Sequence, residues 1–309
     1  MKHYSELTAC RICPRNCGVD RYQSTGFCGA GAELEVNLGQ LHYGEEPVIS
    51  GTRGSGTIFF SHCNLKCVFC QNYEISALGW GERLSEDQLA AMMLDLQTQG
   101  AHNINLVSPS HYQPQIVQSI LLAKDQGLTI PIVWNSNAYE TRDSIRALNG
   151  IVDIFLPDFK YAYSAYSKKY SLAADYPKLA IEAIAEMQKQ VGLITLDQDG
   201  IAKRGLIIRI LVLPNNLAGV SRILDHIADE LGTEPQLSLM AQYYPTHQAA
   251  QYQELNRGIT IAEYEQALDA VHARGFRNVW IQELSCSSDW TPDFFAPNSD
   301  EHRESNAYE

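Results

Sequence analysis

Three closely spaced cysteines, Cys63, Cys67 and Cys70, are the residues of this chain best suited to chemistry. They follow a short apolar run, TIFFS, with the spacing C-x3-C-x2-C. Three thiolates can hold three irons of a cubic iron–sulfur cluster, whereas ordinary ferredoxin sequences supply four. The fourth iron would lack a protein ligand and could bind a reactant. His62 beside them leaves a structural zinc site as the alternative, although zinc cysteines usually form pairs separated by a longer loop.

A second cysteine-rich segment lies upstream and is different in kind. Cys10, Cys13, Cys17 and Cys28 stand among glycines and prolines. A segment of this composition cannot build a hydrophobic core, so a bound metal must supply folding energy. Four cysteines can close a zinc site or hold a second [4Fe–4S] cluster for electron relay, and the sequence leaves both open.

The composition bounds the class of protein. The chain has 309 residues with 45% hydrophobic content, enough for one large domain and a small appendage. A net charge of −13 without a basic stripe argues against a nucleic-acid partner. No apolar run approaches the roughly 20 residues of a membrane span, and the N-terminus lacks a secretory signal. We therefore expect no membrane association and a cytoplasmic location, where eight cysteines are metal ligands rather than disulfides.

From residue 57 onward, β-branched apolar runs alternate with amphipathic stretches. Capping boxes at Ser85 and Thr260 mark two of the helix starts. Repeated strand–helix alternation predicts βαβ units and a parallel sheet. The predicted strands are 57–61, 103–108, 131–136, 152–159, 206–214, 237–245 and 278–282.

Polar residues gather where these strands end. Carboxyl ends of the strands of a (β/α) barrel meet on one rim, where the active site is built. The count of strands favours a partial (β/α)6 barrel with an open side over a complete eight-stranded one. The candidate site residues on the rim, besides the cysteines, are Ser108, Ser110, Asn135, Asn137, Asp158, Lys160 and Tyr244.

Three regions are predicted along the chain. Residues 1–50 form a cysteine-rich metal- or cluster-binding region, residues 51–286 the partial barrel, and residues 287–309 an acidic tail. Cys286 follows the last strand and is either a hydrogen-atom donor to a substrate radical or a small buried core residue.

The segments GTIFFSHCNLKCVFCQNYEIS, CRICPRNCGVDRYQSTGFCG and DIFLPDFKY resemble the radical S-adenosylmethionine (radical SAM) superfamily. Within it they resemble the pyruvate formate-lyase activating enzyme-like iron–sulfur proteins. The likeness implies an α/β partial barrel and a [4Fe–4S] cluster on Cys63, Cys67 and Cys70 whose open iron binds SAM. It implies reductive cleavage of SAM to methionine and a 5′-deoxyadenosyl radical, which abstracts hydrogen from a substrate.

The likeness also implies roles for single residues. Phe69 would offer its backbone to the adenine of SAM, and Lys160, in an Asp158-x-Lys160 strand end, would lie near the SAM carboxylate. Relatives bind the SAM amino group with a Gly-Gly-Glu segment, where this chain has Ser108-Pro109-Ser110 and no acidic side chain. Asn135 and Asn137 would meet ribose or methionine groups.

Arg209, within the fifth predicted strand, is expected to pair with a carboxylate of the ligand or to form a buried structural ion pair.

Three functions remain open at this point. The first is glycyl-radical formation on a partner protein, and the second is radical modification of a peptide or small molecule. The third is a non-catalytic iron–sulfur or zinc protein that transfers electrons or holds a partner. Both enzymatic functions would need a flavodoxin- or ferredoxin-type reductant.

Overall fold

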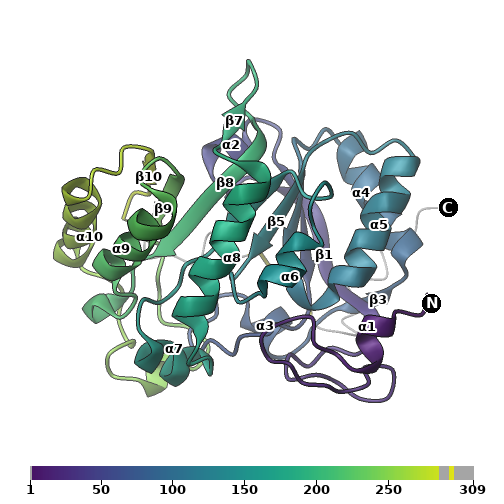
Figure 1. Ribbon diagram of the computed structural model, residues 1–309, viewed down its shortest axis with the longest axis horizontal. Helices are drawn as coiled ribbons and strands as arrows, with labels where there is room; N and C mark the ends of the chain where they lie inside the picture. Colours follow the sequence, from purple (N-terminus) through teal and green to yellow (C-terminus); the bar gives the residue numbers. More distant parts are fainter. Residues whose placement is uncertain (1, 285–291, 296–309) are drawn as a thin grey trace.

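The computed structural model describes residues 2–284 and 292–295, which form one curved sheet with helices on its outer side (Figure 1). The strand order is β10-β9-β8-β6-β5-β4-β2-β1-β3, and β7 pairs with β8 beside this path. Neighbours from β2 to β10 pair in parallel, whereas β1 and β3 are antiparallel additions at one edge. The parallel strands are β2 (Ser55–Phe60), β4 (Ile104–Val107), β5 (Ile132–Ser136), β6 (Ile154–Pro157), β8 (Ala202–Leu211), β9 (Gln236–Met240) and β10 (Val279–Ile281).

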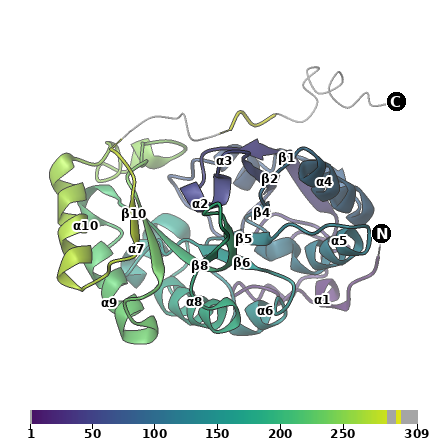
Figure 2. The same cartoon turned by 90° about the horizontal axis from the view of Figure 1, so that it is seen from above.

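Every predicted strand is present, and each parallel crossover carries a helix on the same side of the sheet (Figure 2). Both predicted capping boxes are confirmed, at the starts of the first and last of these helices. The described strands do not close into a ring, because β10 and β3 stand at the two ends of the path. The predicted partial barrel is thus confirmed. The crossover helices are α4 (Glu86–Thr98), α5 (Gln113–Asp125), α6 (Arg142–Arg146), α8 (Tyr176–Val191), α9 (Val220–Leu231) and α10 (Ile261–Ala273).

Several smaller elements were not predicted. The short helices are α1 (Ser5–Thr8), α2 (Pro47–Ser50), α3 (Tyr73–Ser76), α7 (Ser164–Ser171), η1 (Ser110–Tyr112), η2 (Pro214–Asn216) and η3 (Ala249–Gln251). The additional strands are β1 (Leu34–His42), β3 (Glu82–Leu84) and β7 (Thr195–Leu196). β1 matters most, because it lies within the predicted cysteine-rich region and yet extends the sheet by pairing with β2.

Helix α2 lies on the inner side of the curved sheet, opposite the crossover helices (Figure 2). Its Val48 and Ile49 are buried against Val133, Ile154 and Ile207 of β5, β6 and β8. Because these strands are covered on both faces, they are apolar along nearly their whole length. Helix α2 therefore closes the interior of the partial barrel at one end.

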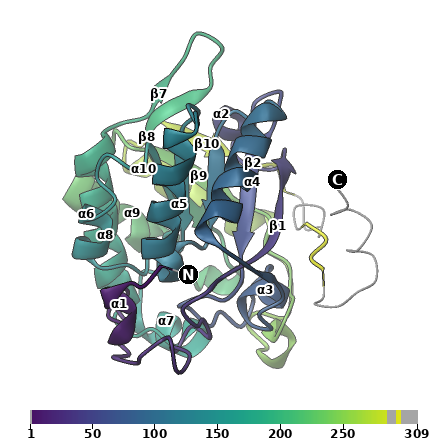
Figure 3. The same cartoon turned by 90° about the vertical axis from the view of Figure 1, so that its right-hand side faces the viewer.

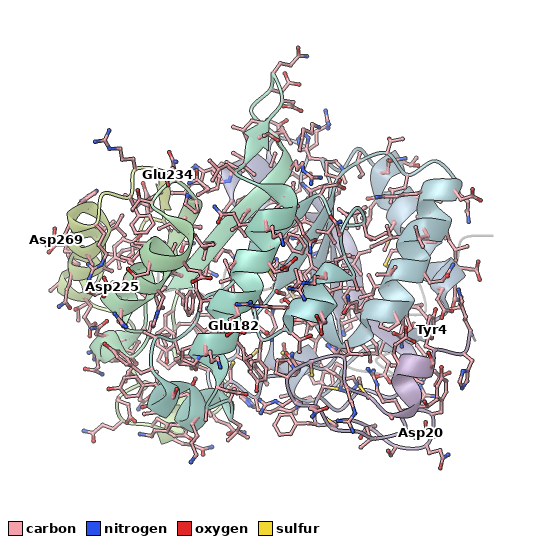
Figure 4. The ribbon with its side chains drawn as sticks, viewed as in Figure 1. Tyr4, Asp20, Glu182, Asp225, Glu234 and Asp269 are labelled. Atoms are coloured by element: carbon pink, nitrogen blue, oxygen red, sulfur yellow. The ribbon has the colours of Figure 1, made fainter. Side chains whose placement is uncertain are left out.

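The N-terminal segment, residues 2–33, runs across the edge of the sheet where the parallel strands have their carboxyl ends, here called the carboxyl-end rim (Figure 3). Tyr4, visible in Figure 4, donates a hydrogen bond of 2.8 Å to Glu86 of α4. Gln115 of α5 donates one of 2.7 Å to the carbonyl of Ala32. These bonds hold the segment against the barrel. Acidic side chains such as Asp225 and Asp269 lie instead on the outer helices, as expected of a solvated surface (Figure 4).

No helix in the described part of the chain combines the length and apolar character needed to cross a bilayer.

We predict that Ile49→Ala lowers the free energy of unfolding by about 2–5 kcal/mol, because Ile49 is fully buried where α2 meets the sheet. Denaturant unfolding of the full chain measures this change. Ile261→Ala is the matched control, since Ile261 is 66% exposed and its loss should change stability by less than about 0.5 kcal/mol. Equal effects of the two substitutions would contradict the packing role of α2.

Candidate active site

The carboxyl-end rim encloses a cavity of about 550 Å³ that reaches from the Cys63–Cys70 loop to helix α2. Its volume is typical of a site for one small ligand or cofactor. The predicted site residues that line it are Cys63, Cys67, Phe69, Cys70, Ser108, Asn135, Asn137, Asp158, Lys160 and Arg209. Sequence reasoning therefore brought most of the rim candidates to one place.

All three cysteine sulfurs of the loop after β2 meet a hydrogen-bonding side chain. Hydrogen bonds to sulfur stabilise negative charge on a thiolate and tune the potential of an iron–sulfur cluster. The contacts are Asn137 Nδ2 to Cys63 Sγ at 3.3 Å, Ser171 Oγ to Cys67 Sγ at 3.0 Å, and Ser76 Oγ with Cys70 Sγ at 3.1 Å.

Burial raises the pKa of the Cys67 thiol to about 12, although Lys160 and Ser171 oppose that shift. A bound metal reverses this balance, because a coordinating thiol loses its proton outright. The three thiols thus suit an iron–sulfur cluster by donor type, by common exposure to one cavity, and by their hydrogen-bonded surroundings.

Backbone strain marks the same rim. His62, Ser108 and Ala138 have φ values of 70°, 58° and 58°, in the left-handed region that non-glycine residues seldom adopt. Each stands just beyond the end of a parallel strand, after β2, β4 and β5. Such strain persists only where the surroundings over-determine it, and it concentrates at functional sites.

Arg209 of β8 lies at the centre of a charge network in the floor of the cavity. Its guanidinium bonds Asp158 Oδ1 at 2.8 Å, Glu45 Oε2 at 3.1 Å and Asn135 Oδ1 at 2.5 Å. Lys160 Nζ donates to the other Asp158 oxygen at 2.7 Å. Burial alone would raise the pKa of Asp158, but Arg209 and Lys160 outweigh it and hold that pKa below its usual range. The guanidinium of Arg209 is thus occupied by groups of this chain.

Sequence reasoning missed two carboxyl groups of this floor, Glu45 and Glu46, which precede α2. Glu45 also accepts a hydrogen bond of 2.8 Å from Asn105 of β4. Burial raises the pKa of Glu46 against the effect of Arg209, and its Oε2 finds no hydrogen-bond partner in the part of the chain the structure describes. The only local signal was the Glu-Glu-Pro sequence, which is common in loops.

Glu140 was also missed, and it explains where Ser110 lies. Its buried carboxylate accepts hydrogen bonds from Ser110 at 2.8 Å, Trp134 at 2.9 Å and Ser136 at 2.6 Å. Ser110 is therefore turned toward Glu140 and does not line the cavity. Glu140 ties together the segments that follow β4 and β5.

Comparisons with known proteins agree with this geometry. Residues 57–197 match the radical SAM superfamily. The chain is 31% identical over 267 residues to the uncharacterized protein MJ0674 of Methanocaldococcus jannaschii, covering 84% of this chain and 73% of that one. The chain belongs to the radical SAM superfamily.

Solved structures with some likeness include two enzymes, at low similarity. HydG, a maturase of the [FeFe]-hydrogenase, is 12% identical with a TM-score of 0.49, over 71% of this chain and 48% of HydG. Methylornithine synthase (PylB) is 13% identical with a TM-score of 0.47, over 75% of this chain and 73% of PylB. The present chain spans only about half the length of HydG.

The remaining predicted residues take separate places around this radical SAM site. Phe69 is buried with its ring edge-on to Tyr161 and Tyr243. Tyr244 is half-buried and is not among the residues that line the cavity. Cys286 lies outside the described residues. Cys10, Cys13, Cys17 and Cys28 lie in the N-terminal segment that covers the rim, where burial raises the pKa of the Cys28 thiol.

We predict that Arg209→Met lowers the free energy of unfolding at pH 7 by about 3–5 kcal/mol, because it leaves buried carboxylates without a counter-charge. The depressed pKa of Asp158 stabilises the native wild type above the ordinary carboxyl pKa of about 4, and this stability is lost as the pH falls through the native pKa.

In the variant, protonation of the buried carboxyl groups removes their unpaired charge and stabilises the native state. The difference in free energy of unfolding between the two proteins should therefore shrink as the pH falls from 7 to 4.5. Denaturant unfolding at both pH values measures it. Arg222→Met, at an exposed position of α9, is the control. A difference between wild type and Arg209→Met that did not depend on pH would contradict the network.

Proposed function

We propose that this chain is an enzyme that cleaves SAM reductively and uses the product radical to take a hydrogen atom from a substrate. The observation that best supports this proposal is the set of three hydrogen-bonded thiols that line a cavity of about 550 Å³. A [4Fe–4S] cluster on Cys63, Cys67 and Cys70 would supply one electron to the sulfonium of SAM, giving methionine and a 5′-deoxyadenosyl radical. The protein binds and orients SAM and shields the radical from water.

Lys160 is the residue best placed to bind the carboxylate of SAM. Lys160 lines the same cavity as Cys67 and Cys70, two of the proposed cluster ligands. Asp158 holds the ammonium in place at 2.7 Å. A charge-assisted bond between the ammonium and a carboxylate would fix the orientation of the ligand as well as its affinity.

The amino group of SAM needs acceptors, and this chain lacks the acidic side chain of the Gly-Gly-Glu segment. Glu140 lies behind the same loop, but both its oxygens accept hydrogen bonds from Ser110, Trp134 and Ser136. We therefore assign this role to the backbone around Ser108, which lines the cavity in a strained conformation. Asn135 and Asn137 would meet the ribose or methionine groups, and Phe69 would offer its backbone to the adenine.

The substrate we propose is a peptide or a loop of a protein. With SAM bound, a cavity of about 550 Å³ has little room for a second enclosed ligand, so the substrate must approach through the opening. Gln71, Gln242 and Gln282 line that cavity and bond to one another, which among the described residues leaves the Gln71 oxygen and the Gln242 amide nitrogen to pair with an extended backbone. Formation of a glycyl radical on a partner enzyme is the most specific form of this proposal. The electron would come from a flavodoxin- or ferredoxin-type reductant.

We predict that the anaerobically purified chain, reconstituted with iron and sulfide and then reduced, forms 5′-deoxyadenosine from SAM, and that Cys67→Ala forms none. Product chromatography measures both. A wild type that binds a four-iron cluster and SAM but forms no product, with or without peptide, would contradict the enzymatic proposal and favour a role in electron transfer or as a scaffold. Turnover stimulated only by small molecules would overturn the peptide assignment alone.

We predict that Lys160→Met weakens SAM binding by roughly ten- to a hundred-fold, because it removes one charge-assisted hydrogen bond. Equilibrium binding of SAM to the reconstituted protein measures the change, with the iron content as a check that the cluster is intact. Lys168→Met on α7 removes the same charge at an exposed position and should leave affinity unchanged. Equal affinities of the two variants would remove Lys160 from the SAM site.

A further inference from the structure

The four N-terminal cysteines come together in a segment with little hydrophobic core. A Cβ placed on Gly26 would lie 3.3 Å from the Cys28 sulfur and 3.9 Å from the Cys17 sulfur. Backbone bonds fold the loop of the other two, since the N–H of Gly18 donates 2.8 Å to the carbonyl of Cys10 and that of Asn16 donates 3.0 Å to the carbonyl of Cys13. The apolar cluster of this segment is small, comprising Tyr4, Leu7 and Ala32 with two half-buried neighbours. Cross-linking by a metal centre would therefore add folding energy to that of the hydrogen bonds that hold the segment against the barrel.

Four thiolates can hold either a zinc ion or a cubic cluster. The position of these cysteines favours the cluster, because Lys66, whose Nζ donates a hydrogen bond of 3.0 Å to the carbonyl of Cys28, directly precedes Cys67 of the rim. Zinc has no redox chemistry, so a site this close to the proposed SAM-binding cluster suits a second iron–sulfur cluster.

Asn64 connects the two sets of cysteines. Arg15, two residues after Cys13, donates from its Nε a hydrogen bond of 2.8 Å to the carbonyl of Asn64, the residue after Cys63. The Oδ1 of Asn64 lies 3.9 Å from Cys63 Sγ and accepts a hydrogen bond of 2.8 Å from Asn137. Asn64 is only 1% exposed, so this contact is shielded from water. Asn64 thus stands between Cys63 and the N-terminal cysteines.

We propose that Cys10, Cys13, Cys17 and Cys28 hold a second, fully ligated [4Fe–4S] cluster, which passes electrons across the Asn64 contact to the SAM-binding cluster. The relay rests on the proposed function, whereas the second cluster itself does not. One electron from an external flavodoxin- or ferredoxin-type donor reduces the N-terminal cluster. It then moves to the rim cluster and is consumed when one molecule of SAM is cleaved.

The charges between the two sites suit this role. Arg15 Nε donates a hydrogen bond of 2.8 Å to the carbonyl of Asn64, and Lys66 Nζ donates one of 3.0 Å to the carbonyl of Cys28. A cluster ligated by four thiolates is an anion that gains a further negative charge on reduction. Cations beside it stabilise the reduced state and raise its potential, which favours electron entry. Cys17 receives the backbone N–H of Phe27, whose ring is 41% exposed, so this site also lies close to the surface where a reductant can dock.

Metal analysis tests the second cluster without any need for SAM turnover. The reconstituted wild type should contain about eight irons and eight sulfides per chain, since each cluster holds four of each. The variant Cys63→Ala/Cys67→Ala/Cys70→Ala keeps the N-terminal ligands. It should retain about half of that iron, with an EPR signal on reduction that does not respond to SAM.

One zinc per chain and no iron in the triple variant would overturn the proposal, whether or not the wild type cleaves SAM. Broadening of the EPR signals by interaction of two reduced clusters should appear in the wild type and be lost in the triple variant. Two clusters without any such interaction would contradict their contact through Asn64.

Reduction potentials test the role of Asn64. Asn64→Ala removes a polar side chain from the contact between the two sites, and with it the oxygen that holds Asn137, the donor to Cys63, so it should shift both potentials. Ser171→Ala removes a donor to Cys67 alone and should lower only that of the rim cluster. EPR-monitored titration measures both, and Asn64→Ser provides a smaller polar replacement if the alanine variant does not fold. Unchanged potentials in a folded Asn64 variant would contradict the proposed route.

Discussion

The ion pairs of Arg209 hold together the parts of the structure on which the candidate site depends. One guanidinium in β8 binds Asp158 from the end of β6, Asn135 from β5 and Glu45 from the loop before α2. Removing such charges from water is costly, and only good geometry with several hydrogen bonds offsets that cost. The network therefore fixes the distance between three strands and the inner helix, and through Asp158 it also fixes Lys160.

Much of the fold could be predicted from the sequence because its signals are local. The apolar runs from 57–61 to 278–282 are strands, and the capping boxes at Ser85 and Thr260 begin helices where expected. The rim candidates converge because parallel strands place their carboxyl ends on one side. β1 was not predicted although residues 34–38, LEVNL, alternate apolar and polar as a strand does, because it lies close to the cysteine-rich segment.

The missed parts of the site depend on contacts between residues far apart in the chain. Glu45 meets Arg209 across 164 positions, and Glu46 lies near Ser238, so neither shows its role in its own neighbourhood. Glu140 follows a strand by a few residues, but its significance lies in binding Ser110 from another loop. The likeness to relatives showed that the acidic residue of the Gly-Gly-Glu segment is absent, but it could not show that Ser110 turns away from the cavity.

Helix α2 limits how a ligand reaches the cavity. Val48 and Ile49 pack against β5, β6 and β8, so the interior of the barrel is filled at that end. Where two ligands share a cavity that is filled at one end, the deeper ligand binds first and the outer ligand holds it in place until the outer one departs. Such an arrangement gives compulsory-order binding in steady-state kinetics.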